Sequence, residues 1–183
     1  SRYFYPQLDK EGLIIDDRAN GGGNVSPMIL ERLSREPYRL TMRRGSARVG
    51  TVPDAVQVGP KVCLINKYSA SDGDLFPWGF HALGLGKLIG TRTWGGIIGI
   101  SGSLPYMDGT DIRVPFFTSY DPKTGSWIVE NHGVDPDILI DNDPIKEWNG
   151  EDQQLNRAIE EVMKELQNRK PLPGIPAPRD FSK

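Results

Sequence analysis

Ser71 is placed where a chain can turn a serine hydroxyl into a nucleophile. An apolar run at residues 62–65 precedes it, a small-residue stretch Ser-Ala-Ser-Asp-Gly-Asp spans residues 69–74, and an apolar run follows at residues 75–80. This order predicts strand, loop and helix, with Ser71 at a helix N-terminus, where backbone N–H groups favour developing negative charge. Ser71 is the leading candidate nucleophile, and plain helix capping by small residues is the alternative.

A second strand, loop and helix unit comes earlier in the chain. Residues 12–16 form a short apolar run, Asn-Gly-Gly-Gly follows at residues 20–23, and Ser26 and Pro27 are typical of a helix start. Acyl transfer needs a nucleophile, a base and N–H donors for the carbonyl oxygen. If the two strands are parallel neighbours, Ser71 attacks while the N–H groups of Gly23 and Asp72 form the oxyanion hole.

The general base is the missing part. His81 lies ten residues beyond Ser71 on the same expected helix, about 15 Å at 1.5 Å per residue, so it is out of reach. We interpret it as an ordinary surface or core-edge histidine. His132 is near Glu130 and is a candidate partner for it, although its neighbours Asn131 and Gly133 favour a turn.

Glu130 is a single carboxylate after a short apolar stretch at residues 126–129, which we expect to be a strand. One role for Glu130 is to cap the following turn. The other is to orient a base or a substrate through hydrogen bonds. Local sequence leaves both roles open.

Composition indicates a single folded unit. The 183 residues are 37% hydrophobic and carry 22 basic and 24 acidic side chains, a net charge of −2. This balance shows no basic footprint for nucleic acid or an anionic membrane. No run approaches the roughly 20 apolar residues of a membrane span, and no signal peptide opens the chain, although one upstream is left open. We expect a cytoplasmic protein without metal or cofactor, and a buried, structural Cys63.

Several other elements are expected. Residues 37–60 lack sustained periodicity and predict a long crossover or lid, residues 87–93 a third strand, and Asp108-Gly109 a hairpin between residues 104–107 and 112–120. An apolar stripe predicts a final helix over residues 155–166. We divide the chain into a folded domain at residues 1–170 and an extended proline-rich tail at residues 171–183.

Four blocks together resemble one family. They are residues 20–23, 69–74, 83–96 and 129–137, in this order. They are similar to the C-terminal catalytic domain of tricorn-type peptidases, within the tail-specific (C-terminal processing) serine peptidases. The resemblance implies an α/β fold of the crotonase and ClpP type, built from stacked strand-strand-helix units, and an oligomer that acts on peptides or unfolded proteins.

The resemblance also implies roles for individual residues. It makes Ser71 the nucleophile, Gly23 and Asp72 the oxyanion donors, and Glu130 the outer member of a Ser-His-Ser-Glu tetrad. In that family the histidine and the second serine come from an earlier domain, ahead of a PDZ module. Neither has a counterpart here, so we expect both domains to lie upstream of this chain.

Two departures separate this chain from its relatives. The tail-specific branch uses a lysine base in a Thr-Phe-Gly-Lys-Gly context, where this chain has Thr-Trp-Gly-Gly with Gly96 at the lysine position. Glycine takes no proton, and Lys87 is misplaced to substitute. Leu40 occupies the position of an aspartate associated with basic residues at the cleavage site, so we expect apolar rather than basic specificity.

Three functions compete on these residues. The first is a serine endopeptidase or oligopeptidase, of which this chain carries the nucleophile. The second is a non-catalytic domain of the same fold that binds apolar ligands or peptides. The third is an acyl-CoA enzyme, which leaves the joint presence of Ser71 and Glu130 without a reason.

Overall fold

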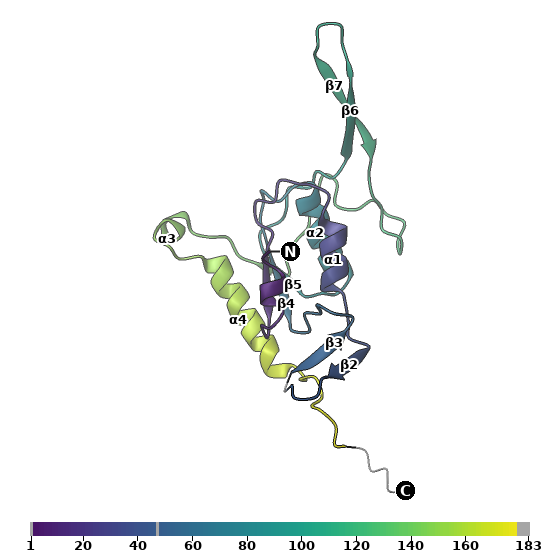
Figure 1. Cartoon of the computed structure of the whole chain (residues 1–183). Coiled ribbons are helices and arrows are strands. Elements are labelled where there is room, and N and C mark those ends of the chain that lie inside the picture. The colour runs from purple at the N-terminus through teal and green to yellow at the C-terminus, as the bar shows by residue number, and fades with distance from the viewer. Residues whose placement is uncertain (1, 47, 179–183) are drawn as a thin grey trace.

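A parallel four-stranded sheet forms the centre of the protein (Figure 1). The computed structural model describes residues 2–46 and 48–178, with only the backbone of residues 101–104. The strands run in the order β1-β4-β5-β8, and each neighbouring pair is parallel. Their bounds are β1 Leu13–Asp16, β4 Lys61–Ile65, β5 Lys87–Gly90 and β8 Ile138–Leu139. All four carboxyl ends therefore meet at one edge of the sheet.

Helices cover both faces of this sheet. α1 (Ser26–Leu33) and α2 (Asp72–Ala82) pack against Cys63, Ile65 and Leu88, through a cluster that includes Phe76 and Phe80. α4 (Gln153–Asn168) covers the other face through Ala158 and Val162, which meet Val62, Leu64 and Ile89. Alternate residues of β4 thus point into two cores, as expected for a strand buried on both faces.

Two antiparallel hairpins extend from this body (Figure 1). β2 (Arg39–Met42) pairs with β3 (Val49–Val52), and β6 (Gly99–Pro105) pairs with β7 (Asp111–Phe117). The β6–β7 hairpin projects away from the sheet as an arm. A short 3-10 helix, η1 (Tyr5–Gln7), precedes β1, and α3 (Pro144–Trp148) precedes α4.

Most expected elements are confirmed. The two strand-loop-helix units, their parallel pairing, the Asp108-Gly109 hairpin and the final helix are all present. Cys63 is fully buried, and burial raises the pKa of its thiol. Residues 171–178 form neither helix nor strand, while residues 179–183 of the expected tail lie outside the described residues.

Three expectations about local structure are wrong. Residues 37–60 are a β-hairpin rather than a structureless crossover, since β2 and β3 pair within them. Residues 126–129 form no strand, and Trp127 only makes an isolated bridge to Tyr120. The third strand ends at Gly90 rather than residue 93. The short elements β8 and α3 carry too little periodicity to be predicted.

None of the described helices is long and apolar enough to cross a membrane.

Candidate active site

Ser71 occupies a sharp turn between β4 and α2. Its backbone has φ 57° and ψ −113°, a conformation that L-residues rarely adopt. The turn is held because the Ser71 N–H donates to Asp74 Oδ2 at 2.9 Å and to Gly96 O at 3.2 Å. Ser71 and Asp74 stand at the two ends of a capping box at the start of α2. A serine with a strained backbone at a helix N-terminus is suited to nucleophilic attack as well as to capping.

The glycine loop after β1 lies against Ser71. A Cβ atom on Gly22 would be 2.9 Å from Ser71 Cβ and 3.3 Å from Ser71 Oγ, so only glycine allows this approach. Gly22 and Gly23 also have positive φ angles of 121° and 151°. The two loops are joined because Ala70 N–H donates to Asn20 O at 2.8 Å. Among the described residues, the N–H groups of Gly23 and Asp72 have no hydrogen-bond partner.

The Asp72 side chain ties the starts of the two helices together. Its Oδ2 accepts from the N–H groups of Val25 at 3.0 Å and Ser26 at 3.1 Å, and its Oδ1 accepts from Ser26 Oγ. Ser26 therefore bonds to Asp72 instead of capping its own helix as expected. This buried carboxylate fixes the Gly23 loop relative to Ser71, a role that the sequence analysis missed.

Asp74 links Ser71 to the loop that follows β5. This fully buried carboxylate accepts from the N–H of Ser71, from Gly95 N at 2.8 Å and from Gly96 N at 3.1 Å. Three backbone donors from two loops thus converge on one side chain, which holds these loops together. The spacing Ser71-x-x-Asp74 is that of a capping box and was the signal available in the sequence.

Glu130 holds the next part of the same loop. Its Oε2 accepts from Ile97 N at 2.7 Å and from Ile98 N at 3.0 Å. Glu130 lies in a turn rather than after a strand, between Val129 and Asn131, which have φ angles of 39° and 59°. The loop at residues 95–98 is thus bonded to Ser71 through Gly96 O and to Glu130 through the N–H groups of Ile97 and Ile98.

Neither histidine contacts the serine. His81 is exposed, with Nε2 3.4 Å from Asp137 Oδ1. His132 Nε2 lies 2.9 Å from Asp135 Oδ2, so the suggested pair with Glu130 does not form. Hydrogen bonds from His132 and then Arg92 lower the pKa of Asp135. Within the described residues, Ser71 has no basic side chain as a hydrogen-bond partner.

The lysine position of the tail-specific branch is closed by glycine. A Cβ atom on Gly96 would lie 2.1 Å from the Trp94 ring, so a side chain requires that ring to move. Lys87 is occupied elsewhere, in an ion pair with the buried Glu161 on α4. No group of three His, Cys, Asp or Glu side chains in the described part of the chain could hold a metal ion.

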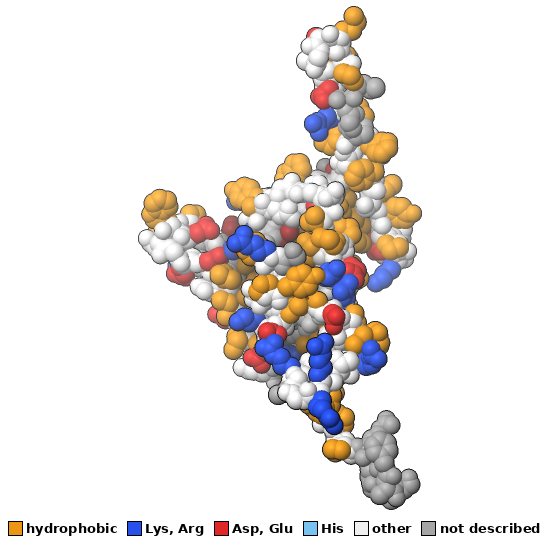
Figure 2. Space-filling model, in the orientation of Figure 1, with side chains coloured by type: hydrophobic (Ala, Val, Ile, Leu, Met, Phe, Trp, Pro, Cys, Tyr) orange, Lys and Arg blue, Asp and Glu red, His pale blue; other side chains and the backbone are white. Residues whose placement is uncertain are grey.

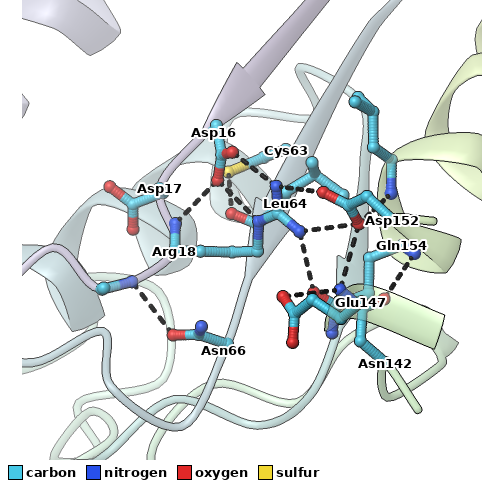
Figure 3. Close-up of polar contacts among 12 residues, drawn as sticks. Asp16, Asp17, Arg18, Cys63, Leu64, Asn66, Asn142, Glu147, Asp152 and Gln154 are labelled. Atoms are coloured by element: carbon cyan, nitrogen blue, oxygen red, sulfur yellow. Dashed lines mark hydrogen bonds and ion pairs between the residues drawn. The ribbon is translucent and has the colours of Figure 1, made fainter. Parts of the chain in front are cut away.

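Arg18 anchors the loop after β1 through two ion pairs (Figure 3). Arg18 pairs with Asp16 at 2.7 Å and with Asp152, the N-cap of α4, at 2.8 Å. The Arg18 hydrogen bond lowers the pKa of Asp152 to about 2. These contacts join the loop that carries Asn20 and Gly23 to α4.

Asp17 is buried beside this network and is 7% exposed. Its Oδ1 accepts from Asn20 Nδ2 at 2.9 Å, while its Oδ2 has no partner among the described atoms. Burial raises the pKa of Asp17 to about 7, and the nearby charges of Asp72 and Asp74 contribute in the same direction. Asp17 was not predicted, because nothing in the sequence distinguishes it from the exposed Asp16.

Leu40 is far from this cluster. It lies half-buried in β2, within the hairpin that follows the C-terminal end of α1 and leads back to the start of β4. That hairpin lies at the opposite end of the molecule from the β6–β7 arm, whereas the Ser71 loop lies at the carboxyl edge of the sheet (Figure 1). Within one copy of the chain, Leu40 and Ser71 are therefore not brought together.

The comparison with protein families decides where this chain belongs. Residues 4–140 match the model of "Peptidase family S41". The chain belongs to this family. The matched range contains Ser71, both oxyanion candidates and Glu130.

Individual relatives agree with the family. The chain is 42% identical to the tricorn protease of Thermoplasma volcanium over 92% of its own length and 16% of the relative's. It is 40% identical to a putative tricorn-like protease C-terminal subunit of Sulfurisphaera tokodaii, over 92% of this chain and 19% of that one. The crystal structure of the tricorn protease superposes with a TM-score of 0.84 at 40% identity, covering 91% of this chain and 16% of that chain.

This S41 chain is much shorter than the relatives that it matches. It spans about one sixth of the tricorn proteases that it matches, so most of each relative has no equivalent among these 183 residues. The expected α/β class, with a parallel sheet covered by helices, is confirmed by the same structural match.

Proposed function

We propose that this chain is the nucleophile-bearing part of a serine peptidase of the tricorn type, acting on peptides or unfolded proteins. Ser71 Oγ attacks the scissile carbonyl and gives its proton to the general base. The peptide C–N bond then breaks, the base protonates the leaving amine, and water hydrolyses the acyl-enzyme that remains. The carbonyl oxygen becomes an oxyanion, and the N–H groups of Gly23 and Asp72 stabilise its charge. The fold is of the crotonase and ClpP type.

The observation that carries this proposal is that two N–H groups without a described hydrogen-bond partner, those of Gly23 and Asp72, lie in the loops around Ser71. Gly22 packs against the serine, and neither the Gly23 nor the Asp72 N–H is used by a described partner. Unsatisfied backbone donors at a helix N-terminus are the components of an oxyanion hole. The carboxylates of Asp72 and Asp74 keep these donors and the serine in fixed positions.

The general base comes from outside this chain. A histidine, oriented by a second serine, completes the tetrad. Glu130 accepts from that serine through Oε1, which has no hydrogen-bond partner among the described residues, while Oε2 stays bonded to the Ile97 and Ile98 N–H groups. The upstream polypeptide carries both residues, ahead of a PDZ-like domain. Without them Ser71 keeps its ordinary, weakly nucleophilic hydroxyl.

An active-site probe tests the proposal. A fluorophosphonate should label the full-length protein, and the label should disappear in Ser71→Ala. Ser126→Ala, which removes an exposed serine elsewhere, is the matched control and should keep the label. Persistent labelling of Ser71→Ala, or no labelling of the native protein, favours the non-catalytic binding domain instead.

A second measurement addresses the base. The 183-residue chain alone should hydrolyse peptides poorly, because its histidines pair with Asp137 and Asp135 rather than with Ser71. Turnover by the isolated chain at the rate of the full-length protein would make His132 or another internal group the base.

Specificity is a separate part of the proposal. Leu40 replaces an acidic residue, so basic side chains at the cleavage site are not favoured and apolar ones are accepted. In one copy of the chain Leu40 lies in β2, on a hairpin apart from the Ser71 loop. A peptide library should show apolar preferences, and cleavage mainly after Lys or Arg would contradict this assignment.

A further inference from the structure

Asp17 is a buried carboxylic acid that the proposed chemistry does not use. It follows β1 and alternates with Ile15, so its side chain lies on the face of the sheet that α1 and α2 cover. Asp17 is 7% exposed, and its Oδ2 has no hydrogen-bond partner among the described atoms. A buried polar oxygen without a partner is costly, so its retention calls for a reason.

Asp17 is bonded to both loops of the candidate active site. Its Oδ1 accepts from Asn20 Nδ2 at 2.9 Å, and its backbone oxygen accepts from Asn20 N at 3.2 Å. The same backbone oxygen accepts at 2.8 Å from the hydroxyl of Ser69, two residues before Ser71. Asp17 therefore lies where the glycine loop and the nucleophile loop both meet the end of β1.

Asn20 is bonded in turn to the residues beside the nucleophile. Its Oδ1 accepts from Gly22 N at 3.1 Å, and its backbone oxygen accepts from Ala70 N at 2.8 Å. These two residues directly precede Gly23 and Ser71, the proposed oxyanion donor and the proposed nucleophile. A shift of Asn20 therefore changes how the donor lies relative to the nucleophile.

No described cation pairs with the Asp17 carboxylate. The Arg18 side chain extends away from it toward Asp152 and pairs with Asp16 and Asp152 (Figure 3). The titratable groups that face Asp17 from β1, β4 and the start of α2 are all acids: Asp16, Cys63, Asp72 and Asp74. Burial first, and then the neighbouring carboxylates, raise the pKa of Asp17 to about 7, although the Asn20 hydrogen bond opposes this shift. Asp17 thus carries a proton at mildly acidic pH and loses it above about pH 7.

An ionised Asp17 needs hydrogen-bond donors that the closed site does not offer. Its neighbours Cys63, Ser69 and Asp74 are fully buried, whereas residues 21–24 of the glycine loop are exposed. Water therefore reaches the carboxylate at least cost by displacement of Asn20 and the glycine loop.

We propose that Asp17 is a positioning residue of the oxyanion hole, which holds the Gly23 loop against Ser71 through Asn20 while its carboxyl group is protonated. Ionisation releases the proton to solvent, admits water beside Asp17 and displaces Asn20. The Gly23 N–H then moves away from the nucleophile. The meaning of this coupling for catalysis rests on the proposed function, which assigns that N–H to the oxyanion.

Fluorophosphonate labelling of the full-length protein tests the coupling. Asp17→Asn imitates the protonated acid, because its amide oxygen still accepts from Asn20 and the side chain does not ionise. The ratio of its labelling rate to that of the native protein should rise about tenfold between about pH 5.5 and about pH 8.5, which is less than the roughly hundredfold loss expected when an oxyanion donor is removed. Titration of the general base cancels in this ratio, because both proteins share the base.

Asp108→Asn is the matched control for this ratio. Asp108 lies in the exposed turn of the β6–β7 arm, which projects from the body of the protein (Figure 2). The ratio of its labelling rate to that of the native protein should stay constant with pH. A constant ratio for Asp17→Asn as well would overturn the proposal.

A double variant tests the connection through Asn20. Asn20→Ala removes the side-chain donor to Asp17 and the side-chain acceptor of Gly22. With Asn20→Ala as the reference, adding Asp17→Asn should produce no change of the labelling ratio with pH. A rise as large as that in the native background would show that Asp17 acts without Asn20, which contradicts the proposed connection.

Amide hydrogen exchange follows the loop without reference to the nucleophile. In the full-length protein, the protection factors of the Gly22 and Ala70 N–H groups should fall about tenfold from about pH 5.5 to about pH 8.5, and they should stay constant in Asp17→Asn. Constant protection in a native protein that is labelled at Ser71 overturns this inference and leaves the proposed function intact. Falling protection in a protein that is not labelled contradicts the proposed function and supports the link between Asp17 and the loop.

Discussion

The loops around Ser71 and the β6–β7 arm are both excursions from the same sheet, yet they are ordered in different ways. Around Ser71, buried carboxylates bind backbone N–H groups: Asp72 holds the start of α1, and Asp74 holds Ser71, Gly95 and Gly96. Every described side chain of β7 is exposed, and the arm is held by the antiparallel pairing of β6 with β7. Charge-assisted hydrogen bonds thus set the site, where small residues offer little apolar surface.

The largest effect expected from this comparison is at Asp74. Asp74→Ala leaves the N–H groups of Gly95 and Gly96 without their acceptor and leaves the Ser71 N–H with only its longer bond to Gly96 O, so it should lower the free energy of unfolding by roughly 3–5 kcal/mol. Urea unfolding of the 183-residue chain measures it. Fluorophosphonate labelling of the full-length variant should also be lost, because the Ser71 turn relaxes.

The same substitution in the arm is the matched control. Asp108 sits in the exposed turn between β6 and β7 and accepts from the N–H and hydroxyl of Thr110. Asp108→Ala should leave the urea midpoint and the labelling rate unchanged. Equal losses for the two variants would mean that burial does not distinguish the two regions.

Asp17, beside the Ser71 loops, should make the free energy of unfolding depend on pH. Its pKa is raised from 3.8 to about 7 by burial, so between these values the unfolded chain loses a proton that the folded chain keeps. Stability from this group is present below about pH 4 and is lost as the pH rises to about 7. Asp17→Asn removes the titration while an amide oxygen still accepts from Asn20.

The measurement is urea unfolding of both proteins at about pH 4 and pH 7.5. The free energy of unfolding of Asp17→Asn, minus that of the native chain, should increase by about 2–4 kcal/mol from pH 4 to pH 7.5. Parallel pH curves for the two chains would show that Asp17 titrates normally.

Glu130 should matter for reactivity more than for folding. Glu130→Ala leaves the N–H groups of Ile97 and Ile98 without their acceptor and removes the outer carboxylate of the proposed tetrad, so labelling of Ser71 in the full-length protein should slow roughly 10- to 100-fold. Glu130→Gln keeps an oxygen acceptor for both N–H groups and should lose less. If Gln and Ala slow labelling equally, the charge rather than the loop contact is what Glu130 supplies.

The sequence predicted the elements whose signals are local and repeated. α4 has a continuous apolar stripe, β4 is an uninterrupted apolar run, and Asp108-Gly109 is a strong turn signal, so all three were found. Residues 37–60 were wrongly predicted because each strand of this hairpin, Arg39–Met42 and Val49–Val52, has only four residues. Over so few residues, alternation of apolar and polar side chains cannot be distinguished from a loop.

At the site, the residue types were predictable and their contacts were not. The positions of Ser71, in a small-residue loop before a helix, and of Gly23, in a glycine run after a strand, follow from loop composition. The carboxylate of Asp72 and the turn at Glu130 depend on which backbone N–H groups lie nearby in space. Those donors come from Val25, Ser26, Ile97 and Ile98, whose proximity only the fold determines.

The smallest effect is expected on the arm itself. Phe116 in β7 is 77% exposed, so Phe116→Ala removes little buried surface and should change the free energy of unfolding by less than about 0.5 kcal/mol. Urea unfolding and the concentration dependence of sedimentation measure stability and association together. A loss above about 2 kcal/mol that persists on dilution would mean that the arm folds back onto the body, because a truncated aromatic is costly only when it is buried. The arm and the Ser71 loops would then both be buried, and they would differ only in the groups that they contact.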